Sequence, residues 1–212
     1  PNVFQVVYRG RPLNSRLRCW WRVKVWGKLG GESAWSEISF WEMGLLDPTD
    51  WVAKWISDGK EEPRREEDFY KPDPAPLLRK SFTVEKEVVR ARLYISGLGY
   101  YEAFINGKRV GDHVLDPLWT TYSRRIFYSV YDVKDLLCRG ENVLGVTLGN
   151  GWYNPLPLRM WGRINLRKAL TIGRPRLLAQ LEILCRDGSK YIVATDKSWK
   201  TTEGPLLRNN IY

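Results

Sequence analysis

The chain has 212 residues, of which 43% are hydrophobic and 27% charged. This balance is that of a globular protein and excludes a disordered chain, and the length suffices for one large domain or for one domain and part of another. The formal net charge is +10, but the basic residues are dispersed rather than gathered in one stripe. We therefore expect solvated faces or a surface toward another domain, and no nucleic-acid partner.

Cysteine and histidine usage argues against a disulfide framework and a metal centre. One histidine cannot build a His-rich site, and a turn holding Asp112, His113 and Asp116 is more typical of hydrogen bonding than of metal ligation. No GxSxG elbow accompanies the histidine. We expect no metal, no cofactor and no catalytic residue in this chain. The three cysteines also lack CxxC spacing and are expected to be isolated thiols: Cys19, Cys138 and Cys185.

No apolar run is long enough to cross a bilayer, so no membrane partner is expected. The chain begins at Pro1 without Met, and we expect its native N-terminus to lie upstream. The absence of a signal peptide therefore assigns no compartment.

The first 45 residues show the pattern of a hairpin. Trp21, Val23 and Val25 alternate with polar neighbours, which predicts a half-buried strand. A glycine-rich turn follows at 27–31, and a second strand is predicted over 34–42. Because a hairpin alone is marginal in water, we expect these strands to close a β-sandwich that begins upstream. Open strand edges and exposed tryptophans then predict self-association at high concentration.

The next segment predicts a turn and a loop. Asp47, Pro48, Thr49 and Asp50 form a turn or helix-start signal. Residues 59–76 are rich in proline and in charges of both signs, which indicates a long solvated loop rather than acid–base chemistry.

A continuous β pattern begins at Leu77. Asn106-Gly107 and Asp187-Gly188 are hairpin signals, since both turn positions must accept positive φ. A short helical turn is expected at 132–137, and no long amphipathic helix is present. Many short strands joined by such turns predict an all-β fold, an antiparallel β-sandwich or jelly roll. The strands are expected at 77–84, 89–96, 100–105, 108–110, 125–131, 143–149, 176–186 and 190–195.

Two stretches resemble a known family. Residues 20–26 and 33–37 resemble the closing strands of the fibronectin type III-like module that opens many bacterial α-L-rhamnosidases. A longer set of motifs is similar to the N-terminal β-sandwich domain of the same enzymes, and more loosely to sugar-binding jelly rolls. These motifs are NGKRVG (106–111), YDV (131–133), DLL (135–137), GEN (140–142) and LGNGWY (148–153).

The resemblance covers nearly the whole chain. It implies a partial fibronectin type III-like hairpin over residues 1–45 and a galactose-binding-like sandwich over residues 46–212. In that family an inverting mechanism uses two carboxylic acids of an (α/α)-barrel further along the chain. That barrel is absent here, so the resemblance implies a non-catalytic accessory fragment of a hydrolase acting on terminal α-L-rhamnosyl groups. The implied partners are rhamnose-containing glycans and the missing catalytic barrel.

Two loops carry aromatic rings beside polar side chains, the combination that binds sugars by stacking and hydroxyl hydrogen bonds. The alternative is that these rings pack the sandwich or a seam between domains. An autonomous carbohydrate-binding module, a purely structural scaffold and a basic nucleic-acid binder remain alternative functions. The candidate sugar-binding residues are Asp116, Trp119, Tyr122, Asn150, Trp152, Tyr153 and Trp161.

Overall fold

The computed structural model describes residues 7–210, in two compact units, one ending at Trp51 and the other beginning at Val52. The first unit contains the predicted hairpin. Strand β1 (Arg18–Trp21) pairs antiparallel with β2 (Ser39–Glu42), with Arg18 opposite Glu42. These two residues also form an ion pair of 2.9 Å.

The regular part of this hairpin differs from the predicted one. We expected the strand to run through Val23 and Val25, but β1 ends at Trp21. The hydroxyl of Ser36 accepts the backbone N–H of Val23 at 2.8 Å, and that of Ser33 accepts the N–H of Val25 at 3.1 Å. Serine hydroxyls thus replace carbonyls of the opposite segment, and this competition interrupts the regular ladder.

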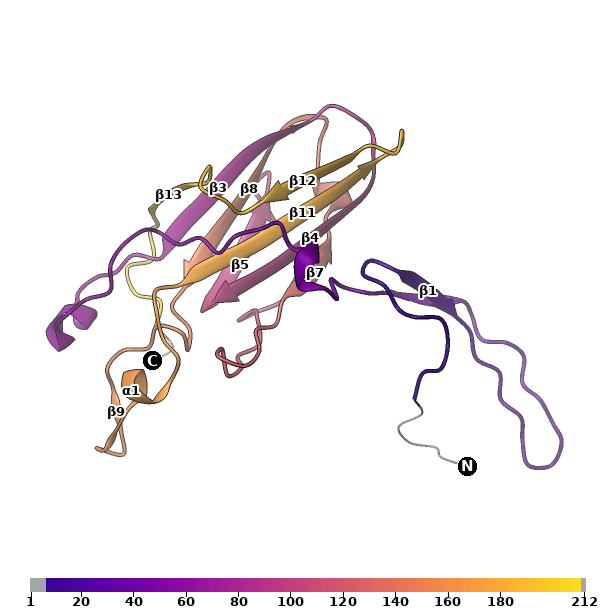
Figure 1. The fold of residues 1–212 in the computed structure, drawn as a ribbon, viewed down its shortest axis with the longest axis horizontal. Coiled ribbons are helices and arrows are strands. Elements are labelled where there is room, and N and C mark those ends of the chain that lie inside the picture. The colour runs from indigo at the N-terminus through magenta and orange to yellow at the C-terminus, as the bar shows by residue number, and fades with distance from the viewer. Residues whose placement is uncertain (1–6, 211–212) are drawn as a thin grey trace. The chain divides into compact units, whose positions relative to one another are not determined.

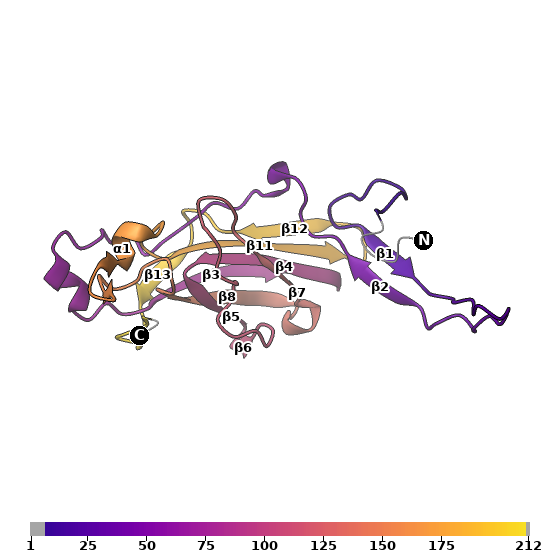
Figure 2. The same ribbon diagram turned by 90° about the horizontal axis from the view of Figure 1, so that it is seen from below.

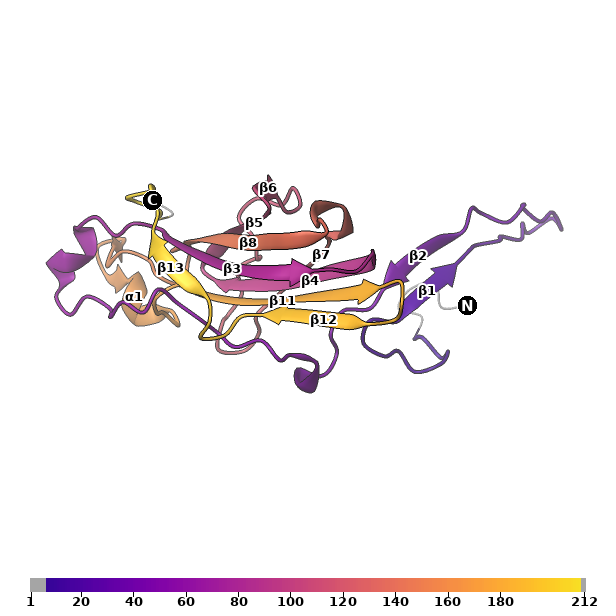
Figure 3. The ribbon, with the colours of Figure 1, turned by 90° about the horizontal axis from the view of Figure 1, so that it is seen from above.

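The second unit is the predicted antiparallel β-sandwich (Figure 1). Figure 2 and Figure 3 show its two sheets as separate layers. The four-stranded sheet has the order β12-β11-β4-β7, with bounds Lys190–Ala194, Arg176–Cys185, Val88–Leu98 and Ser129–Asp132. The five-stranded sheet has the order β13-β3-β8-β5-β6, with bounds Lys200–Glu203, Pro76–Val84, Gly140–Gly149, Tyr100–Ile105 and Lys108–Arg109.

Alternating apolar residues of both sheets form one core. Each buried leucine or isoleucine contributes about 1.5–3 kcal/mol relative to an exposed one, so this core stabilises the unit. Its fully buried members include Leu93 and Ile95 of β4, Leu144 and Leu148 of β8, and Leu181 of β11.

The Asn-Gly and GEN motifs bind each other at one end of the sandwich. Asn106 and Gly107 have φ values of 52° and 79°, as the predicted hairpin turn requires. The Asn106 amide donates to the carbonyl of Leu136 at 3.0 Å and to Oδ1 of Asn142 at 2.8 Å. Its own Oδ1 accepts the N–H of Val143 at 2.9 Å. These motifs therefore specify the fold rather than a reaction.

Two of the short helices correspond to turns that the sequence predicted. In η1 (Pro48–Asp50), Asp47 accepts the N–H of Thr49 at 2.8 Å and Asp50 accepts the N–H of Asp47 at 3.0 Å, a capping box. A second expected turn is η3 (Lys134–Leu136).

Other elements depart from the prediction. The strand expected at 125–131 begins only at Ser129, because the N–H groups of Arg124 and Arg125 both bond the carbonyl of Thr121 in a turn. Strand β13 was not predicted. Further short elements are η2 (Glu66–Tyr70) in the charged loop, β9 (Arg159–Met160), β10 (Ile164–Asn165) and α1 (Leu166–Ala169).

Candidate carbohydrate-binding edge

Two turns meet closely at one end of the sandwich because glycines allow it. Gly99, between β4 and β5, has φ of 102°, and a Cβ there would overlap the carbonyl oxygen of Gly149. Gly151 has φ of 51°, and a Cβ there would lie 3.1 Å from the Cα of Gly99. Both positions therefore need glycine. The turn that follows β8 is held against this end, and it carries Trp152 and Tyr153.

Trp119 and Trp152 stack on each other. Their ring centroids lie 5.2 Å apart and their planes differ by 28°. Trp119 is 45% exposed and Trp152 is half-buried. An apolar ring surface therefore stays open to solvent, and it can take the apolar face of a sugar.

Tyr122 and Tyr153 also meet, but below the solvent-accessible surface. Their centroids lie 5.2 Å apart in an edge-to-face arrangement at 86°. Both are buried in a small cluster with Leu98. Burial raises the pKa of Tyr122 to about 12. These two rings support the edge from within.

Asp116 ties the two sheets together. Its Oδ2 accepts the hydroxyl of Tyr101 in β5, that of Ser129 in β7 at 2.6 Å and that of Tyr131 in β7 at 3.0 Å. The backbone carbonyl of Asp116 accepts the N–H of Tyr101 at 3.0 Å. Burial raises the pKa of Tyr101 and of Tyr131, so both stay protonated donors. The carboxylate thus anchors the start of the 116–122 loop.

Asn150 belongs to a buried polar network. Its side-chain oxygen accepts the amide of Asn154 at 2.6 Å, and its backbone N–H donates to Asn209 at 2.7 Å. The guanidinium of Arg167 donates to Asn154 and to the carbonyl of Pro155, both at 2.7 Å. Asn150 therefore shapes its turn. The role of Arg167 was missed, because a buried arginine inside a basic stretch has no distinguishing pattern in the sequence.

Trp161 stands apart from the other candidates. It lies in the turn between β9 and β10 with φ of 50° and is 80% exposed. Within residues 7–210 it makes no ring contact. The structure thus brings together Trp119 with Trp152 and Tyr122 with Tyr153, and through them the two predicted loops.

The described part of the chain, residues 7–210, shows neither a metal-ligand grouping nor a membrane-spanning helix. No three His, Cys, Asp or Glu side chains gather there as metal ligands. No helix among these residues has the length and apolar character needed to cross a membrane.

Comparison with known proteins gives two family matches. The model described as "Alpha-L-rhamnosidase N-terminal domain" matches residues 86–212. The model described as "Rha78A-like, N-terminal immunoglobulin domain" matches residues 2–47. The latter describes an immunoglobulin module where the sequence resembles a fibronectin type III-like one, and both are two-sheet sandwiches.

Full-length relatives and solved structures agree with these models. An alpha-L-rhamnosidase of Formosa agariphila is 38% identical over 98% of this chain and 23% of its own length. One from Alteromonas sp. is 38% identical over 95% of this chain and 21% of its own. The crystal structure of alpha-L-rhamnosidase from Aspergillus terreus matches with a TM-score of 0.83 at 38% identity, covering 96% of this chain and 23% of that one. This chain therefore spans less than a quarter of those relatives.

Proposed function

Because the chain belongs to the family of α-L-rhamnosidase N-terminal domains, we propose that it is a non-catalytic accessory region of an enzyme that removes terminal α-L-rhamnosyl groups. Its partner would be a catalytic barrel that lies outside this chain. Residues 1–45 would close a fibronectin type III-like or immunoglobulin-like module, and residues 46–212 would form the sandwich that positions the barrel.

The observation that supports this proposal is the hydrogen bonding of the Asp116 carboxylate at the candidate edge. Glycoside hydrolysis needs two carboxyl groups that face the scissile bond, one as acid and one as base or nucleophile. One oxygen of Asp116 instead accepts hydrogen bonds from three hydroxyl groups, which come from both sheets. A carboxylate held in this way supports structure rather than proton transfer.

The direct test is hydrolysis of an aryl α-L-rhamnoside by this chain and by a longer protein that contains it. We expect release of the aryl group only from the longer protein. Substitution of Asp116 by Asn in the isolated chain should leave its background rate unchanged, as should the control D112N at an exposed neighbouring carboxylate. Hydrolysis by the isolated chain that D116N abolishes and D112N spares would contradict the proposal.

A second candidate function is sugar binding at the Trp119–Trp152 pair. The stacked rings and the 45% exposure of Trp119 favour it. We expect L-rhamnose or a rhamnosylated oligosaccharide to change tryptophan fluorescence saturably, and the variants W119A and W152A to lose that change. The matched control is W26A, an exposed tryptophan of the other unit. No saturation up to about 10 mM sugar, equivalent to less than about 3 kcal/mol of binding free energy, would leave only the positioning role.

A further inference from the structure

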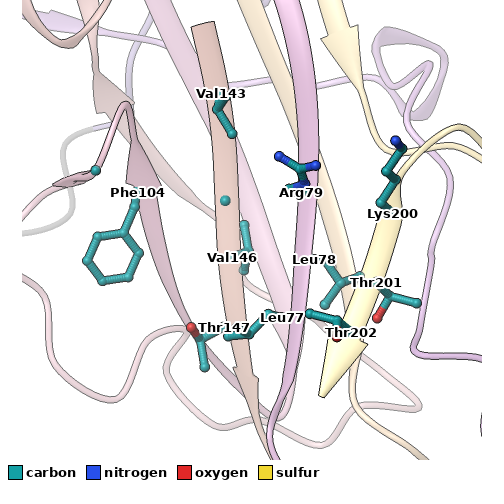
Figure 4. Close-up of a pocket in the computed structure, with 12 residues that line it drawn as sticks. Leu77, Leu78, Arg79, Phe104, Val143, Val146, Thr147, Lys200, Thr201 and Thr202 are labelled. Atoms are coloured by element: carbon teal, nitrogen blue, oxygen red, sulfur yellow. The ribbon is translucent and has the colours of Figure 1, made fainter. Parts of the chain in front are cut away.

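The outer face of the five-stranded sheet carries a groove of about 580 Å³ (Figure 4). The groove follows β8 and is flanked by β5 on one side and by β3 and β13 on the other. The outward-facing residues that line it and that matter here are Leu77, Arg79, Phe104, Gly145, Thr147 and Lys200.

One row of residues crosses the sheet through the middle of this groove. Lys200 in β13 is the Cα partner of Arg79 in β3, and Arg79 is in turn the partner of Gly145 in β8. Gly145 pairs with Phe104 in β5. Side chains at paired positions share a face of the sheet, so two cations, a glycine and an aromatic ring stand side by side.

Among the described residues, the two cations have no carboxylate partner. Neighbouring cations are paired, since Arg109 contacts Glu102 at 3.3 Å and Lys60 contacts Glu203 at 2.7 Å. Arg79 and Lys200 make no ion pair within residues 7–210, and no acidic residue lines the groove. Like charges directly opposite each other destabilise a strand pair. A bound anionic group would remove that repulsion.

The remaining lining suits a sugar ring. Gly145 has no side chain, and nothing lies within 4 Å of where its Cβ would be, so the floor of the groove is open. Phe104 lines the groove at its β5 side, and Figure 4 shows its ring on the side of β5 away from β8, while Thr147 lies one row away from Gly145 with a hydroxyl. Aromatic rings with a few polar groups are the usual lining of a carbohydrate site.

We propose that this groove binds an acidic oligosaccharide, one whose sugar rings carry carboxylate or sulfate groups. The sugar ring lies over Gly145, with Phe104 at the β5 border of the groove, and its anionic group lies between Arg79 and Lys200. The site is separate from the Trp119–Trp152 edge and does not depend on the accessory role proposed above.

The sharpest variant is Gly145→Val. Its φ is not in the left-handed region, the added side chain meets open space, and valine favours strands, so the fold is retained while the groove is filled. A second variant, R79A with K200S, removes the charges alone. The control K190S removes an exposed cation of β12 in the other sheet. Circular dichroism melting of each variant establishes that it folds.

Binding is measured by calorimetry with trigalacturonate, a sulfated galactan oligosaccharide, a neutral galactan oligosaccharide of equal length, and hexaglutamate. We expect one or both acidic glycans to bind, and Gly145→Val and the charge variant each to weaken binding more than about tenfold, about 1.4 kcal/mol, while K190S does not. Affinity should also fall as salt rises, because exposed charges are screened. The trigalacturonate and sulfated arms distinguish the two sources of charge.

Three results would overturn the proposal. One is no saturable binding of either acidic glycan to the unmodified chain. Another is binding that folded Gly145→Val leaves unchanged. The last is equal affinity for hexaglutamate or for the neutral glycan, which would assign the groove to an acidic peptide or to sugars in general.

Discussion

Tyr122, one of the candidate sugar-binding residues, is buried, and its burial affects its pKa. It packs in the inner cluster with Tyr153 and Leu98, and burial raises its pKa to about 12. An unfolded tyrosine titrates near 10. The folded state therefore binds the proton more tightly than the unfolded state, and this contribution to stability is complete below pH 10 and lost as pH rises from 10 to 12.

We expect the free energy of unfolding to fall between pH 9 and pH 12, with Tyr122 accounting for about 2 kcal/mol of the fall. Urea unfolding at several alkaline pH values measures this. The variant Y122F should show a smaller fall than the unmodified chain, whereas Y70F, at an exposed tyrosine, should match it. Equal pH dependence for Y122F and the unmodified chain would refute the assignment.

At the residue scale the sequence singled out two loops but did not predict that they meet or what each side chain does. Both predicted loops meet, as the Trp119–Trp152 stack shows. Asp116 and Asn150, two of the candidate sugar-binding residues, accept hydrogen bonds within the domain, and their part in sugar binding stays a prediction. Composition and spacing reveal polar groups beside rings, but burial depends on chain segments distant in sequence, such as β7 around Asp116.

At the element scale, glycines at the ends of strands allow the turns that connect those strands. Gly99 and Gly107 both have positive φ, of 102° and 79°. They differ in their surroundings, because a Cβ at Gly99 would overlap the carbonyl of Gly149, while nothing lies within 4 Å at Gly107. Substitutions at these two glycines therefore separate the energetic cost of backbone strain from that of steric overlap.

G107A should cost about 1–2 kcal/mol, the strain of a left-handed alanine. G99A should cost more than about 3 kcal/mol, because the turn after β8 must move away and Trp152 moves with it. Chemical denaturation of both variants measures the difference, and near-UV circular dichroism reports the tryptophan environment. If the two substitutions cost the same, the close approach of these turns contributes nothing to stability.

Strands with clear alternation were predictable as elements, and the others were not. Strands β3, β4, β8 and β11 have long runs of alternating or continuous apolar residues that pack the core, and their positions match the expected ones closely. Strand β13 has the sequence KTTE with every residue exposed, so no hydrophobic pattern marks it. It forms because β3 offers a free edge with which it pairs. This pairing joins segments distant in sequence, so the local sequence pattern does not reveal it.

At the scale of the whole molecule, the sandwich and the first unit differ in how far they bury their apolar side chains. The second unit closes its core between two sheets. Among the described residues of the first unit the β1–β2 ribbon is two-stranded. Trp20 in β1 is 61% exposed, and Trp26, beyond the end of β1, is 69% exposed. Two-stranded ribbons have open edges on both sides, and contiguous exposed rings favour association.

We therefore expect this chain to form dimers or larger species as concentration rises. Sedimentation velocity over about a hundredfold concentration range measures this, because mass action shifts an associating protein toward oligomers. The paired substitution of Trp20 and Trp26 by serine should reduce association, while W161S, which removes an exposed ring of the sandwich unit, should not. A profile that is monomeric throughout would show that the exposed ribbon does not pair with itself. Its rings would then be free to meet a different polypeptide surface, such as the catalytic barrel proposed above as a partner.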